Sequence, residues 1–124
     1  MSVPRISKED LKDLLEGDTP NAPVILDARL KYPYEHSTVT LPGAVRIDPD
    51  ALDTSGLSTD RDIVAYDSDP EELVSARVAS ALIRQGYRAS ALAGGLPEWI
   101  TAKFPIDEKD APKQAPPKAG GLKG

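Results

Sequence analysis

The chain has 124 residues, which is enough for one domain of ordinary size and too few for two. It contains no cysteine, so disulfides, thiolate metal sites and cysteine nucleophiles are excluded, and its single histidine, His36, excludes a multi-histidine metal site. A formal net charge of −5 argues against a nucleic-acid-binding surface. The sequence shows no apolar stretch of about 18 residues and no signal peptide, so we expect no membrane association and a cytoplasmic location.

The first half of the chain predicts one helix and two strands. Residues 7–10 resemble a capping box and are followed by leucines at helical spacing, which predicts a helix that ends at Gly17. The continuous apolar run at 23–28 predicts a buried strand. The remaining segments are predicted as a loop, a short strand and one capped helical turn, at residues 30–43, 44–47 and 48–52.

The second half predicts two further strands and two helices. The apolar run at 62–66 predicts a second buried strand. The longest helix is predicted over 70–85, capped by Asp69 and ended by Gly86. A strand and a last helix that carries Trp99 in the core follow, at residues 88–92 and 97–103. Because strands alternate with helices, the pattern favours an α/β fold with a mainly parallel sheet.

The regular pattern stops after about residue 107. Residues 109–124 are rich in proline, lysine and glycine and carry a net charge of +3, so residues 1–108 carry −8. A segment with so few apolar side chains cannot offset the entropy of ordering its chain. We therefore predict one domain over residues 1–108 and a disordered tail over 109–124.

Six short motifs follow one another along residues 5–107. They read Asp27-Ala28-Arg29, Leu41-Pro42-Gly43-Ala44, Ile63-Val64-Ala65-Tyr66, Ser75-Ala76-Arg77-Val78-Ala79, Gly86-Tyr87 and Leu92-Ala93-Gly94-Gly95-Leu96-Pro97-Glu98-Trp99. In order and spacing they resemble the rhodanese-like domain. The resemblance implies an α/β fold whose central, mainly parallel sheet is flanked by helices on both faces. It also implies that Asp27 and Arg29 pair within the scaffold.

The resemblance further implies an active-site loop that follows the strand at 62–66. In the family, a cysteine at the start of this loop takes sulfane sulfur from a donor and passes it on as a persulfide. This chemistry needs a thiolate, and a loop whose backbone N–H groups and helix N-terminus hold negative charge. Here Asp67 stands at the nucleophile position and Asp69 at the position of a second cysteine in one variant of the loop. A carboxylate cannot carry a persulfide, so sulfur transfer by the family mechanism is excluded.

Asp67 has two interpretations. It is either a nucleophile or metal ligand, or a fixed anion that fills a site built for a thiolate and its substrate; we favour the fixed anion, because backbone donors and a helix dipole stabilise a carboxylate there. The protein is then a non-catalytic binding or regulatory module that needs no cofactor and no resident metal. Its partner would be an unidentified protein or a small anionic ligand. The predicted binding residues are Asp67, Ser68, Asp69, Glu71, Glu72, Gly94 and Gly95.

Two alternatives stay open. Asp67 and Asp69 after a buried strand are also similar to the haloacid dehalogenase-like phosphatases, in which the first aspartate attacks phosphate, the second is the general acid and base, and magnesium is bound. The other alternative is an active sulfurtransferase whose cysteines have been replaced by these aspartates.

Overall fold

The computed structural model describes residues 3–17, 22–69 and 71–109. Of the tail predicted over 109–124, only Lys109 is described, and its N–H donates a hydrogen bond to the carbonyl oxygen of Thr38 (2.9 Å). The rest of the predicted tail lies outside the described residues. Within the described ranges, no helix is both long enough and apolar enough to cross a membrane.

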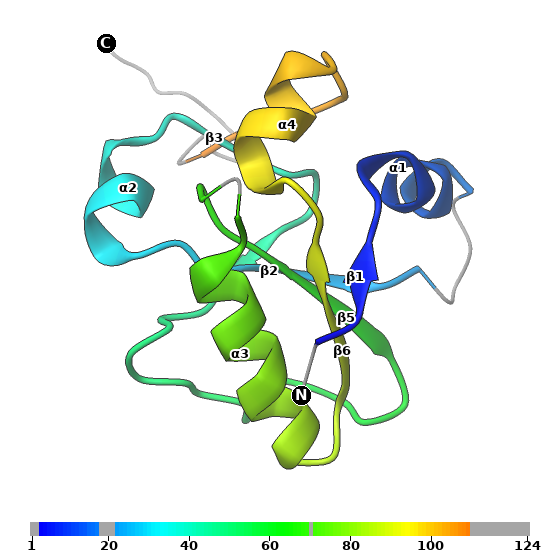
Figure 1. Ribbon diagram of the computed structural model, residues 1–124, viewed down its shortest axis with the longest axis vertical. Coiled ribbons are helices and arrows are strands. Elements are labelled where there is room, and N and C mark those ends of the chain that lie inside the picture. Colours follow the sequence, from blue (N-terminus) through cyan, green and yellow to red (C-terminus); the bar gives the residue numbers. More distant parts are fainter. Residues whose placement is uncertain (1–2, 18–21, 70, 110–124) are drawn as a thin grey trace, which may run out of the picture.

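A five-stranded parallel sheet forms the centre of the molecule (Figure 1). Its strands lie in the order β1-β6-β5-β2-β4, and every neighbouring pair is parallel. A second, two-stranded antiparallel sheet joins β3 to β7. The strands are β1 Arg5–Ile6, β2 Val24–Asp27, β3 Val39–Thr40, β4 Val45–Arg46, β5 Asp62–Tyr66, β6 Arg88–Leu92 and β7 Asp107–Glu108.

Helices cover both faces of the sheet, as the resemblance implies. One apolar cluster packs α3 (Leu73–Arg84) on one face, and a second cluster packs α1 (Lys8–Glu16) and α4 (Gly95–Thr101) on the other. The two faces separate because neighbouring residues of a strand point to opposite sides: Ile63 belongs to the first cluster and Val64 to the second. Trp99 of α4 is fully buried in the second cluster, as expected.

Several boundaries differ from the predictions. The region 30–43, predicted as a loop, contains the short helix α2 (Lys31–His36) and strand β3. The helical turn predicted at 48–52 is only a turn, in which the N–H of Ala51 donates to the carbonyl of Asp48 (3.1 Å). The last helix begins at Gly95 rather than at 97, and strands β1 and β7 were not predicted. These strands have two residues each and form by pairing with distant segments, so local patterns do not reveal them.

The most informative difference concerns the long helix. The sequence predicts that it begins at residue 70 with Asp69 as its cap, but α3 begins at Leu73, and Glu72 stands at the cap position. The side chain of Asp69 instead accepts a hydrogen bond from the N–H of Glu71 (2.8 Å), which makes a local turn within the loop. Helix α3 therefore begins three residues later than the sequence predicts.

Candidate functional site

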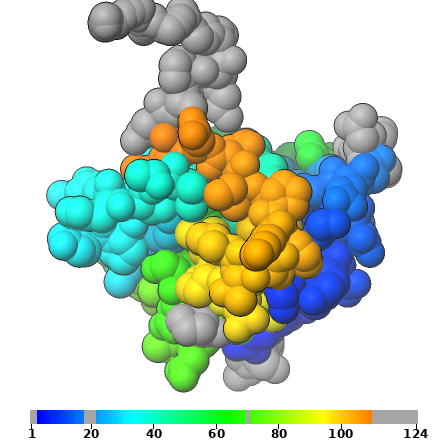
Figure 2. Space-filling model, turned by 90° about the horizontal axis from the view of Figure 1, so that it is seen from above, coloured from blue at the N-terminus to red at the C-terminus, as the bar shows by residue number. Residues whose placement is uncertain are grey.

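The predicted site residues lie at the end of the sheet where the parallel strands finish. The loop 67–72 connects β5 to α3, and the chain turns at Gly94 to pass from β6 into α4, whose first residue is Gly95 (Figure 1). We call Gly94 and Gly95 together the glycine turn. Because β5 and β6 are parallel neighbours in the sheet, the loop and the turn lie at the same end of the sheet. Figure 2 views this end of the molecule, with α4 in yellow and orange beside α1 in blue.

The carboxylate of Asp67 is turned inward, and the residue is 1% exposed. Its Oδ1 accepts a hydrogen bond from the N–H of Asp69 (2.9 Å), and its Oδ2 accepts one from the N–H of Ser75 (2.5 Å). The N–H of Val74 also stabilises this carboxylate. Val74 and Ser75 belong to the first turn of α3, whose N–H groups have no partner within the helix. We call these three N–H donors, around the Asp67 carboxylate, the cradle.

The charge of Asp67 is stabilised only in part by the cradle. Burial raises the pKa of the Asp67 carboxyl above its ordinary value, and the three backbone hydrogen bonds offset only some of that rise. The Asp67 carboxylate is therefore held by the dipoles of backbone N–H groups, in a position where it is shielded from water.

The glycine turn forms the wall behind the loop. Gly95 has φ +64°, and a Cβ atom there would lie 2.8 Å from the carbonyl oxygen of Asp67 and 2.9 Å from that of Asp69. The N–H of Leu96 donates to the carbonyl of Asp67 (2.9 Å). Only glycine permits both this backbone conformation and this close approach.

Glu72 connects the loop to the turn. It is 8% exposed and has a left-handed backbone, with φ +59°. Its Oε2 accepts a hydrogen bond from the N–H of Gly94 (2.9 Å), and its Oε1 pairs with Nε of Arg5 in β1.

The structure thus brings most of the predicted residues into one network. Asp67, Asp69 and Glu72 are joined to Gly94 and Gly95 by hydrogen bonds or direct contact. Ser68 is half-buried within the loop, whereas Glu71 is exposed and contributes its backbone N–H to the local turn.

Sequence reasoning missed the residues that act through their backbone and the partner of Glu72. No side-chain pattern could mark the donors of Val74 and Ser75, since every residue except proline carries an N–H. Arg5 is 67 positions from Glu72 in the chain, and only the pairing of β1 with β6 brings it to the site.

The pairing of Asp27 with Arg29 is confirmed beside the site. Nε of Arg29 donates to Oδ1 of Asp27 (2.8 Å) and Nη2 donates to Oδ2 (2.5 Å), with both side chains almost fully buried. Burial alone would lower the pKa of Arg29, but the hydrogen bond and the charge of Asp27 outweigh it, so this pKa is raised.

Two further observations bear on binding. Within residues 3–17, 22–69 and 71–109, no group of three or more histidine, aspartate or glutamate side chains is arranged to hold a metal ion.

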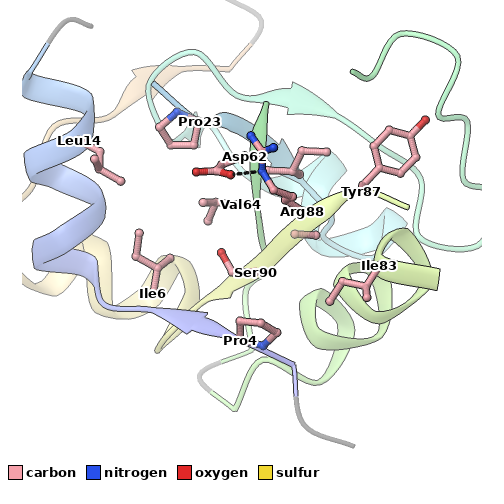
Figure 3. Close-up of a pocket in the computed structure, with 12 residues that line it drawn as sticks. Pro4, Ile6, Leu14, Pro23, Asp62, Val64, Ile83, Tyr87, Arg88 and Ser90 are labelled. Carbon is pink, nitrogen blue, oxygen red and sulfur yellow. Dashed lines mark hydrogen bonds and ion pairs between the residues drawn. The ribbon is translucent and has the colours of Figure 1, made fainter. Parts of the chain in front are cut away.

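A groove of about 420 Å³ lies at the opposite end of the sheet, at the first residues of β5 and β6 (Figure 3). None of the predicted site residues lines it; its wall is mostly apolar and includes Pro4, Ile6, Leu14, Ile83 and Tyr87.

Comparison with known proteins agrees with this architecture. The sequence matches the family model of the rhodanese-like domain over residues 7–102. A solved structure from Bacillus halodurans has a TM-score of 0.75 and 18% identity, covering 92% of this chain and 85% of that one. A structure from Lactobacillus plantarum has a TM-score of 0.75 and 23% identity, covering 83% of this chain and 87% of that one.

A third solved structure is the rhodanese-like domain of a protein from Anabaena sp. It has a TM-score of 0.72 and 27% identity, and the match covers 91% of this chain and 87% of that one. No match was found among curated proteins.

Proposed function

We propose that this chain, which belongs to the rhodanese-like domain family, is a non-catalytic binding or regulatory module without sulfurtransferase activity. One observation carries the proposal: the carboxylate of Asp67, at the family's nucleophile position, occupies the backbone donors of its own loop. The chain has no cysteine at any position, so no thiolate exists to accept the sulfur.

The filled cradle also bears on the kind of partner. A small anion could reach the N–H groups of Asp69 and Ser75 only by displacing a carboxylate that is 1% exposed. We therefore favour a protein partner over a small anionic ligand. The cytoplasmic location and the absence of a resident cofactor remain predictions from the sequence.

A phosphohydrolase function gains no support from this geometry. That mechanism needs Asp67 to present an oxygen to phosphate and Asp69 to exchange a proton with the substrate. Instead, both oxygens of Asp67 accept backbone hydrogen bonds, and an oxygen of Asp69 accepts the N–H of Glu71. Titration with magnesium, followed by Trp99 fluorescence, should show no saturable binding below millimolar concentrations.

The decisive experiment is a sulfur-transfer assay with thiosulfate and cyanide. In the family reaction a thiolate takes the sulfane sulfur and releases sulfite, and the persulfide then gives thiocyanate to regenerate the thiolate. We expect no thiocyanate above background from the native chain. Formation of thiocyanate by the native chain would overturn the proposal.

The variant Asp67→Cys sharpens the assay, because it supplies the missing thiol among the donors of the cradle. These donors favour the thiolate, while the carboxylates of Asp69 and Glu72 oppose both the thiolate and an anionic donor. We expect weak but measurable transfer from Asp67→Cys. The matched control Asp67→Ser, of similar size but without a thiol, should give none.

A further inference from the structure

Glu72 is the second buried carboxylate of the loop, and its environment differs from that of Asp67. Its side chain is 11% exposed and pairs with Arg5, which is 45% exposed, at the edge strand β1. Its carboxylate also accepts the N–H of Gly94 (2.9 Å). One side chain therefore connects the edge strand, the start of α3 and the turn before α4.

The backbone of Glu72 shows that this position is held against a local preference. A residue with a Cβ atom avoids the left-handed region, where Glu72 lies with φ +59°. Such a conformation persists only where surrounding contacts impose it. The contacts that the structure shows for this side chain are those with Arg5 and Gly94.

The glycine turn transmits the position of Glu72 to the cradle. Glu72 accepts a hydrogen bond from the N–H of Gly94. The next residue, Gly95, lies against the carbonyl oxygens of Asp67 and Asp69. The following N–H, of Leu96, donates to the Asp67 carbonyl (2.9 Å). Moving the turn away would release the loop backbone that presents the Asp67 carboxylate to the N–H of Ser75.

We propose that Glu72 is the positioning residue of the cradle: by clamping Gly94 to Arg5, it fixes the glycine turn against the loop and keeps the Asp67 carboxylate on its backbone donors. This inference deepens the proposed function and rests on it, since it concerns the same cradle. It makes the edge strand β1 part of the site, although β1 lies 61 or more positions before the loop in the sequence.

The test is amide hydrogen exchange on the full chain, measured by NMR. The N–H groups of Asp69 and Ser75 report the cradle, and the N–H of Val64 in β5 reports global unfolding. In Glu72→Gly, the backbone strain is relieved while the clamp is lost. We expect exchange at Ser75 to accelerate about tenfold more than exchange at Val64.

Two further variants separate the positioning role of Glu72 from the effect of removing any carboxylate from the loop. Glu72→Gln keeps an acceptor for the Gly94 N–H and should restore most of the protection lost at Ser75. Glu71→Ala removes an exposed carboxylate from the same loop and should change exchange at Ser75 by less than about twofold. If Glu72→Gly does not fold, amide exchange at Ser75 and Val64 is compared in Glu72→Ala and Glu72→Gln at a lower temperature.

Several outcomes would overturn the inference. They are unchanged protection of Ser75 in Glu72→Gly, equal acceleration at Ser75 and Val64, or an effect of Glu71→Ala as large as that of Glu72→Gly. None of these outcomes depends on sulfur transfer. Thiocyanate formation by the native chain would refute the proposed function and leave the clamp as a separate result.

Discussion

Asp27 and Asp67 lie at the ends of neighbouring strands, and each is 1% exposed. Arg29 meets Asp27 with two hydrogen bonds and a full positive charge. The partners that meet Asp67 are backbone N–H groups, which carry only partial charges. Burial accordingly raises the pKa of Asp67. Asp27 is thus paired with a buried arginine, whereas Asp67 is held by backbone N–H groups.

The largest expected effect is on the scaffold pair. Asp27→Ala leaves the guanidinium of Arg29 buried without its carboxylate partner and should lower the free energy of unfolding by about 3–5 kcal/mol. Asp67→Ala removes an acceptor from backbone donors and should cost less, about 1–3 kcal/mol. Urea denaturation at neutral pH measures both. A larger loss in Asp67→Ala would reverse the roles that we assign to the two carboxylates.

The next prediction tests whether the environment of Asp67 depends on the close backbone contact at Gly95. Gly95→Ala adds a Cβ atom 2.8 Å from the carbonyl oxygen of Asp67 at φ +64°, and should destabilise the chain by about 2–4 kcal/mol. The matched control is Gly86→Ala, at φ +97° with no atom within 4 Å of the new Cβ, which should cost about 1–2 kcal/mol. Equal losses in the two variants would mean that the close contact at Gly95 is absent in solution.

The pH dependence of stability tests the environment of Asp67. The pKa of Asp67 is raised in the fold, so the stability that its protonated form contributes is present below the ordinary pKa and is lost as pH rises through the raised value. Native stability should therefore fall, relative to Asp67→Asn, as pH rises through this window. Denaturation curves at a series of pH values measure the difference.

Asp53 supplies a control of opposite sign for this experiment. Hydrogen bonds from Ser55 lower the pKa of Asp53 below its ordinary value. Native stability should therefore rise, relative to Asp53→Asn, as pH increases through the lowered and ordinary values. A slope of the same sign for Asp53 and Asp67 would contradict the environment described for one of them.

The smallest effect concerns an ion pair without burial. Arg88 and Asp62 meet at 2.8 Å beside the apolar groove, with side chains 59% and 67% exposed (Figure 3). Asp62→Asn should change stability by at most about 1 kcal/mol, and less at high salt. A loss as large as that of Asp27→Ala would mean that charge pairing, rather than burial, governs the scaffold pair.

Local sequence patterns are sufficient to predict several elements of this protein. The apolar run at 62–66 gave β5 with its observed bounds, and Ser7 caps α1 through the N–H of Asp10 (3.0 Å), as expected. The order of motifs also placed Asp67 directly after β5 and Gly94-Gly95 where the chain enters the last helix. Each of these signals is contained within a few neighbouring residues, where side-chain type decides conformation.

The orientation of the Asp67 side chain, in contrast, follows from the folded backbone around it. Whether Asp67 points outward as a nucleophile or inward as a fixed anion depends on the N–H groups of Asp69 and Ser75, and an N–H leaves no trace in residue type. Helix α3 begins at Leu73, after Glu72, which has a left-handed conformation and whose carboxylate contacts Arg5 and Gly94. Those contacts join segments far apart in the chain, and they form only once the parallel sheet has placed β1 beside β6.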